Sequence, residues 1–189
     1  MTRQALAQKE KTMPIPVPIP PDDKRTWSID FESTYSKEIS LKVMPTWAYV
    51  HHPEVDIYLL SVAGPDGFVW VGRPRDFDWS LLENKIVVAH NMGFDGLVLR
   101  RLENDGVVPR INYAELHCTA DMAAYFKLPR ALKDVAQFVF KLPDLAKTGR
   151  AVRDRMKGVA VEKLADDPEI RVYAANDAIL CRRLWMEWS

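Results

Sequence analysis

Short apolar runs bounded by charged or turn-forming residues recur between Trp27 and Thr119, and we interpret them as strands. Gly64, Pro65, Asp66 and Gly67 form a turn signal between two of these runs, which predicts an antiparallel meander early in the chain. The predicted strands are Trp27–Glu32, Trp47–His51, Ile57–Ala63, Phe68–Val71, Ile86–Ala89 and Glu115–Thr119.

Apolar residues at helical spacing alternate with the later strands and continue to the end of the chain. Strands that alternate with helices favour parallel pairing, so an α/β fold is expected. The predicted helices are Trp79–Asn84, Phe94–Asn104, Ala120–Phe126, Ala131–Phe140, Glu162–Asp166 and Glu169–Trp188.

Composition predicts one domain with a sizeable core, because 48% of the 189 residues are hydrophobic. Residues 1–25 differ in composition, since prolines alternate with apolar residues from Met13 to Pro21. We therefore expect an extended, flexible arm before a folded domain at 26–189.

No run approaches the roughly 18 apolar residues of a membrane span, and the N-terminus lacks the hydrophobic segment of a secretory signal. Cys118 and Cys181 suggest neither a disulfide framework nor a zinc site. We expect a cytoplasmic monomer without a membrane partner.

Asp30 and Glu32 lie two residues apart in the first predicted strand. Side chains alternate between the faces of a strand, so these two carboxylates share one face. Their repulsion and the cost of desolvating them disappear if a cation lies between them. Taken alone, the pair also fits a solvated strand face.

A third carboxylate, Asp95, follows the predicted strand Ile86–Ala89. Asn91 and Gly93 form a turn, which places Asp95 in the first turn of the next helix. The helix dipole alone favours an acidic residue there by about 0.3–1 kcal/mol, so a structural role is an alternative.

Tyr173 and Asp177 are four residues apart in the last predicted helix and therefore share one helix face. Ala174, Ala175 and Ala178 are small, and they allow this helix to approach the element that it covers closely. Such a Tyr–Asp pair is also common on ordinary amphipathic helices.

Together, Asp30, Glu32, Asp95 and Asp177 give four carboxylates without a cationic side chain in their motifs. Oxygen ligands suit hard divalent cations, and paired cations of this kind cleave phosphodiesters. The pattern predicts a nuclease. No histidine has a zinc-type partner at a suitable interval, so structural roles are expected for His51, His52, His90 and His117.

The three motifs, Asp30-x-Glu32, Asn91-x-x-Phe94-Asp95 and Tyr173-x-x-x-Asp177, resemble those of the DEDD exonuclease superfamily in its tyrosine-bearing branch. Val172 stands where the histidine branch has its histidine. The flanks, including Leu128–Lys133, are similar to the proofreading domain of family A DNA polymerases, especially those of bacteriophages. The resemblance spans about residues 26–189 and implies a ribonuclease H-like fold, a mixed five-stranded sheet flanked by helices.

The resemblance also implies a mechanism in which Asp30, Glu32, Asp95 and Asp177 hold two Mg2+ or Mn2+ ions, and Tyr173 orients the attacking water. Asn91 is expected to contact the terminal nucleotide or the turn that holds Asp95, and Ser33 and Thr34 are expected to face the substrate. The product would be a nucleoside monophosphate released from a 3′ end. Single-stranded or frayed ends would be preferred because unpairing a duplex costs energy.

The net charge of the chain is zero, so any attraction for nucleic acid must come from a local cluster of basic residues. We expect a flexible basic loop with Lys147, Arg150 and Arg153 to contact substrate phosphates. A solvated loop without that role explains the same residues equally well.

Three functions therefore remain in view. The first is a DNA 3′–5′ exonuclease in a bacterium or phage-infected cell, either part of a polymerase, with a polymerase domain or subunit as its partner, or acting alone. The second is an RNA 3′–5′ exonuclease, because the metal motifs do not report on the 2′-hydroxyl. The third is a catalytically silent domain that binds nucleic acid or braces a polymerase.

Overall fold

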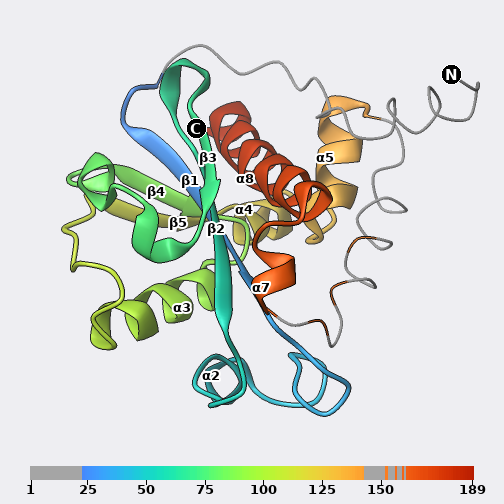
Figure 1. Ribbon diagram of the computed structural model, residues 1–189. Coiled ribbons are helices and arrows are strands. Elements are labelled where there is room, and N and C mark those ends of the chain that lie inside the picture. Colours follow the sequence, from blue (N-terminus) through green and yellow to red (C-terminus); the bar gives the residue numbers. More distant parts are fainter. Residues whose placement is uncertain (1–22, 143–151, 153–155, 157–158, 160) are drawn as a thin grey trace, which may run out of the picture.

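A mixed five-stranded sheet with the strand order β3-β2-β1-β4-β5 forms the centre of the molecule (Figure 1). The structure is a computed structural model that describes residues 23–142, 152, 156, 159 and 161–189. Strand β1 (Thr26–Ser33) pairs antiparallel with β2 (Ile57–Ala63), which pairs antiparallel with β3 (Val69–Gly72). On its other side β1 runs parallel to β4 (Ile86–Ala89), and β4 runs parallel to β5 (Glu115–Cys118). The ribonuclease H-like architecture and the early antiparallel meander are thus confirmed.

Helices cover both faces of the sheet (Figure 1). Helix α8 (Pro168–Trp188) packs along β1 to β4, and α3 (Met92–Asn104) packs against β1, β4 and β5. Helix α5 (Leu132–Phe140) and α4 (Thr119–Tyr125) contact α8, and α7 (Val161–Leu164) precedes it. Short 3-10 turns occupy Pro65–Gly67, Pro74–Asp76 and Trp79–Leu82, the last within the predicted helix Trp79–Asn84.

The strand predicted at Trp47–His51 is wrong, because Thr46–Val50 forms a short helix, α2. The N–H of Tyr49 donates to the carbonyl of Pro45, and the N–H of His51 donates to that of Trp47, which is the bonding of one helical turn. Tyr49 and Val50 are buried, whereas Trp47 is 63% exposed. Aromatic and β-branched residues favour strands on average, but five residues are too few to display a helical period, and packing against α3 decides the outcome.

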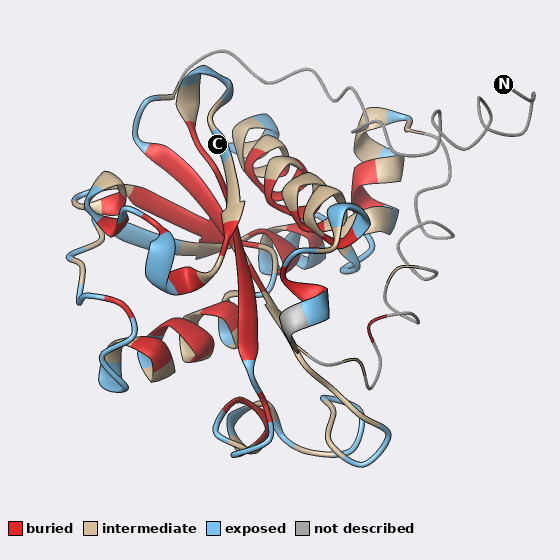
Figure 2. Cartoon of the chain, in the orientation of Figure 1, coloured by how far each residue is buried: buried red, intermediate tan, exposed pale blue. Residues whose placement is uncertain are grey.

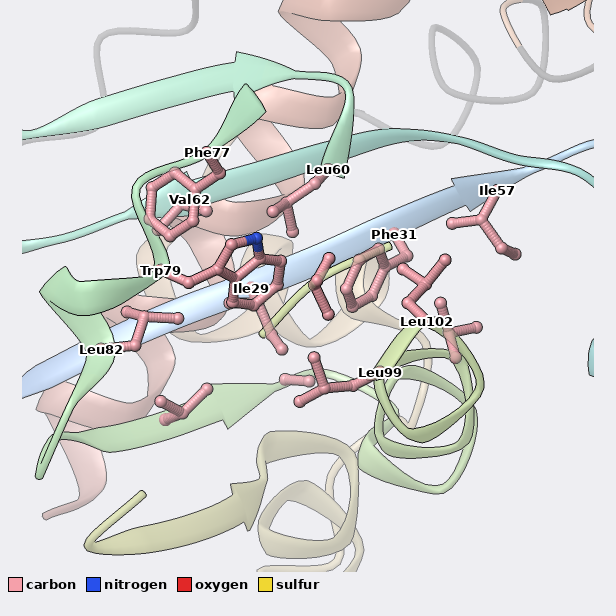
Figure 3. Packing of buried hydrophobic residues seen from close by; sticks show 14 of the residues in the cluster. Ile29, Phe31, Ile57, Leu60, Val62, Phe77, Trp79, Leu82, Leu99 and Leu102 are labelled. Carbon is pink, nitrogen blue, oxygen red and sulfur yellow. The ribbon is translucent and has the colours of Figure 1, made fainter. Parts of the chain in front are cut away.

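The largest apolar core lies between the sheet and α3 (Figures 2 and 3). Ile29 and Phe31 of β1 enter this core and pack near Leu99 and Leu102 of α3. Each buried side chain of this size stabilises the fold by roughly 1.5–3 kcal/mol. Because side chains alternate along a strand, burying Ile29 and Phe31 on this face turns Ser28, Asp30 and Glu32 toward α8.

Helix α8 is fixed to the sheet by buried polar contacts. The Ser28 hydroxyl donates to the carbonyl of Ala178 at 2.7 Å. The buried Arg182 donates from Nε to the carbonyl of Thr26 at 2.9 Å and from an Nη atom to that of Asp23 at 3.1 Å. Asp23 and Arg25, which belong to the expected arm, are bonded to the fold, because their carbonyls accept from Arg182 and from the N–H of Ile86. Among the described residues, no helix combines the length and apolarity needed to cross a membrane.

Candidate active site

Three carboxylates meet where α8 crosses the middle of the sheet. Asp30 and Glu32 come from β1, and Asp177 comes from α8. One oxygen from each of these side chains lies within 4.8 Å of the others. The fully buried Ala174 and Ala178 allow this approach because their methyl groups keep the helix close to the strand.

Asp95 lies beside this triad, in the first turn of α3. Its carboxylate accepts a hydrogen bond from the backbone N–H of Phe31 at 3.1 Å, and the residue is 3% exposed. The carbonyl of Asn91 in turn accepts the N–H groups of Phe94 and Asp95 at 2.7 and 3.0 Å. The Asn91 backbone thus begins the turn that holds Asp95, whereas its side chain makes no capping hydrogen bond, so both roles expected of that side chain stay predictions.

Two acids of this site, Asp30 and Asp95, have raised pKa values. Burial raises the pKa of Asp30 to about 7, although the nearby charge of Lys133 opposes the rise. Burial, followed by the charge of Asp30, raises the pKa of Asp95 well above its ordinary value. Carboxyl groups in this condition gain strongly from a cation, because a cation stabilises their ionised form.

A lysine that the motifs do not contain also enters the site. Lys133, from the first turn of α5, forms an ion pair with Asp177 through Nζ. The same ammonium lies 4.8 Å from the centre of the Tyr173 ring. Lys133 ends the Leu128–Lys133 flank, and the three acidic motifs assign it no role. Its position depends on how α5 packs against α8, which no local pattern reports.

His90 fixes the segment that leads into α5. A carbonyl can only accept, so Nε2 of His90 carries the proton donated to the carbonyl of Arg130 at 2.6 Å. The other nitrogen, Nδ1, then accepts from the hydroxyl of Thr119 at 2.9 Å. Burial lowers the pKa of His90 and keeps the ring neutral, as these bonds require. Arg130 is paired with Asp121 at 2.7 Å. The expected structural role of His90 agrees with these contacts.

A cleft of about 390 Å³ opens over the carboxylates. Its lining includes the four motif carboxylates and Asp134, together with Asn91, Tyr173 and Lys133. An adjoining groove of about 620 Å³ shares Phe31, Glu32 and Phe94 with the cleft. Ser33 and two lysines, Lys37 and Lys42, line this groove.

The remaining predicted substrate contacts differ in what the structure shows of them. The Ser33 hydroxyl lies 2.8 Å from that of Tyr49, at the wall of the groove. The Thr34 hydroxyl donates to the carbonyl of Glu54 at 3.3 Å and accepts the N–H of Asp56 at 2.9 Å, so it serves the fold of its loop. Lys147, Arg150 and Arg153 lie outside the described residues.

The donor set fits a hard divalent cation. All candidate ligands of the triad are carboxylate oxygens, and Asp95 adds a fourth carboxyl group beside them. Oxygen-only sites of this kind suit Mg2+ or Mn2+ rather than zinc, which prefers nitrogen and sulfur.

No family model matches the chain, and no curated protein matches it in sequence. Among solved structures, one match is a chain of the structure described as "Structure of yeast NOT1 MIF4G domain co-crystallized with CAF1". The identity is 11%, the match covers 86% of this chain and 81% of the other, and the TM-score is 0.47. A likeness at this level carries no argument about fold or function.

Proposed function

We propose that this chain is a metal-dependent 3′–5′ exonuclease that hydrolyses DNA from single-stranded or frayed 3′ ends to nucleoside monophosphates. The observation that carries the proposal is the meeting of Asp30, Glu32 and Asp177 within 4.8 Å, with Asp95 buried beside them. These carboxyl groups come from three separate elements, and burial raises the pKa of two of them, Asp30 and Asp95, so the fold disfavours their ionised forms. A site for divalent cations explains why such a cost is retained.

Each residue has a role in the proposed reaction. Asp30, Glu32, Asp95 and Asp177 would hold Mg2+ or Mn2+, which when bound lowers the pKa of a coordinated water and stabilises a negatively charged leaving oxygen. Tyr173 lines the same cleft and would orient the attacking water through its hydroxyl. A phenol with its usual pKa of about 10 is a poor base near neutral pH, so an orienting role suits it better.

The shape of the site supports a flexible strand as the substrate. The cleft over the carboxylates adjoins the larger groove lined by Ser33, Lys37 and Lys42. A terminal nucleotide in the cleft would leave the preceding nucleotides beside hydroxyl and ammonium groups, which bind phosphates. A paired end would first have to be opened, which costs free energy.

One observation favours the catalytically silent alternative. Lys133 pairs with Asp177 and so supplies the positive charge that a cation would otherwise bring. A single ammonium nevertheless balances only one of the four motif carboxylates, and the pKa values of Asp30 and Asp95 remain raised in its presence. The exonuclease is therefore the better supported function.

The test uses matched single-stranded DNA and RNA, labelled at the 5′ end, with Mg2+, Mn2+ or EDTA. We expect DNA to shorten stepwise from its 3′ end in either metal and to remain intact in EDTA. Cleavage of RNA alone would favour the RNA exonuclease, and binding without cleavage of either strand would leave the silent domain.

A pair of variants locates the activity. The double substitution Asp30→Ala, Glu32→Ala should abolish cleavage while the protein stays folded. Asp76→Ala with Asp166→Ala removes two exposed acidic residues that do not line the cleft and serves as the matched control. Full activity in the first variant would refute the site.

A further inference from the structure

Lys133 contacts both residues that α8 contributes to the site. Its ammonium pairs with Asp177 and lies over the ring of Tyr173, 4.8 Å from the ring centre. The side chains of Lys133 and Asp177 are only 17% and 10% exposed, so this pair is largely removed from water. Asp177 Oδ1 is buried and accepts no hydrogen bond among the described residues, which leaves Lys133 as its partner.

The segment before Lys133 is fixed independently of the carboxylates. His90 holds the carbonyl of Arg130, and the guanidinium of Arg130 pairs with Asp121. Lys133 follows three residues after Arg130, at the start of α5. These contacts hold the backbone that carries Lys133 close to Asp177. The Lys133 side chain can therefore change partners without a movement of the backbone.

The balance of charges in the cleft indicates when the Lys133 side chain leaves Asp177 for another partner. The four motif carboxylates carry four negative charges when ionised, and Lys133 balances that of Asp177; Asp134, the residue after Lys133, adds a fifth acidic side chain to the cleft lining. Two divalent cations would balance the four motif carboxylates, so the lysine charge at Asp177 would then be in excess. A divalent cation and an ammonium at the same carboxylate repel each other, and a phosphate of the substrate is an anion that the displaced ammonium would then contact.

We propose that Lys133 is the resident counterion of Asp177, that it competes with the divalent cation for this carboxylate, and that it contacts the substrate phosphate once the site is loaded. The inference rests on the proposed function. It assigns Lys133 a place in substrate binding that the three acidic motifs do not supply. It also explains why a cationic side chain lies among residues that would hold a metal.

A structural role for the same ion pair would have the opposite signature. If Lys133 only braced α5 against α8, its loss would loosen the site, and cation and nucleotide would both bind more weakly. Competition predicts that the two affinities change in opposite directions. The sign of the change in cation affinity therefore separates the two explanations.

The experiment compares Lys133→Met, Lys133→Gln and Lys133→Arg with the wild-type protein. Lys163→Met, which removes an exposed lysine of α7, is the matched control. Binding of Mn2+ alone is measured by titration calorimetry at pH 7.5, and binding of thymidine monophosphate, a reaction product, is measured with Mn2+ present and with EDTA. Neither measurement requires turnover.

We expect the Met and Gln variants to bind Mn2+ about tenfold tighter, because a neighbouring positive charge has been removed. The same variants should bind thymidine monophosphate with Mn2+ present about tenfold more weakly, because a charged hydrogen bond to the phosphate has been lost. Lys133→Arg, which keeps the charge, should stay near the wild-type affinity for Mn2+, and Lys163→Met should change neither affinity.

Equal or weaker Mn2+ binding by both neutral variants would overturn the inference and leave the metal site standing. Unchanged nucleotide binding in those variants would overturn the phosphate contact. Absence of Mn2+ binding in every folded variant and in the wild-type protein would overturn the proposed metal site itself. Two neutral replacements of different polarity are used so that poor folding of one does not prevent the comparison.

Discussion

The carboxylate of Asp95 accepts a hydrogen bond from the backbone N–H of Phe31, 3.1 Å away. Phe31 stands between Asp30 and Glu32, with its ring in the apolar core. The second acidic motif is therefore bonded to the backbone of the first, at the residue that separates its two carboxylates. This bond fixes the position of Asp95 relative to Asp30 through the main chain.

Asp95→Asn should make the metal-free protein more stable and inactive. The amide oxygen can still accept the N–H of Phe31, while the charge that burial and Asp30 disfavour is removed. We expect the free energy of unfolding in EDTA at pH 7.5 to rise by about 1 kcal/mol or more. Cleavage should fall by at least about 10²-fold. Asp95→Ala is the contrast, because it also leaves the N–H of Phe31 without its acceptor and should be less stable than Asp95→Asn. Equal stability of the two variants would contradict the importance of this hydrogen bond.

The metal-free protein should lose stability as the pH rises from about 4 to about 7. The pKa of Asp30 is raised by burial from its ordinary value of 3.8 to about 7 on folding, so the folded chain binds more protons in this window. The stabilising contribution is complete below the lower value and is lost as the pH passes the upper one, with a total of a few kcal/mol. Asp95 acts in the same direction, whereas His90, whose pKa is lowered, acts in the opposite one.

Urea denaturation in EDTA at pH 5 and pH 7.5 measures this dependence. Asp30→Asn removes the titrating group, so comparison with it isolates the contribution of Asp30 from those of Asp95 and His90. Saturating Mn2+ should flatten the dependence in the wild-type protein, because the cation binds the ionised carboxylates. An identical pH dependence in wild type and Asp30→Asn would show that Asp30 titrates as an ordinary surface acid.

Tyr173→Phe should reduce the turnover number on the order of 10²-fold with little change in Mn2+ affinity. The ring stays in place beneath the ammonium of Lys133, but the hydroxyl that would orient the attacking water is gone. Tyr125→Phe removes a hydroxyl from a residue that is 83% exposed and provides the control. The measurement is single-turnover cleavage of a 5′-labelled oligonucleotide at saturating Mn2+. A rate equal to that of the wild type would exclude the hydroxyl from the reaction.

His90→Ala should destabilise the protein by about 1–3 kcal/mol at pH 7.5, because it leaves the carbonyl of Arg130 and the hydroxyl of Thr119 without their partner. Hydrogen exchange should increase in the segment before α5, which carries Lys133 toward the site. His52→Ala, which alters an exposed loop bond to Glu54, is expected to cost much less. Comparable losses in the two variants would mean that His90 is an ordinary surface contact.

Local patterns predicted most of the fold and the acidic members of the site. Ile29 and Phe31 alternate with Asp30 and Glu32, so the period of the strand alone indicates which side chains face the core and which share the other face. The four-residue spacing of Tyr173 and Asp177 likewise predicts that the two side chains share one helix face, and both line the cleft. These features depend only on positions close together in the chain.

Features that depend on packing between distant elements were not predicted. The sequence around Trp47 has strand-forming residues, and contact with α3 turns it into one helical turn. Lys133 belongs to none of the three motifs, and it reaches Asp177 only because α5 and α8 pack together. The substrate contacts expected of Lys147, Arg150 and Arg153 stay predictions, since these residues lie outside the described ones.

The bond between Ser28 and Ala178 joins positions 150 residues apart. A ribosome must therefore synthesise nearly the entire domain before the last helix can dock beside the first strand. Until that moment Asp177 is separated from Asp30 and Glu32, and slow long-range pairing of this kind delays assembly further. Under the proposed function, a nascent chain would therefore stay inactive until its last helix has docked.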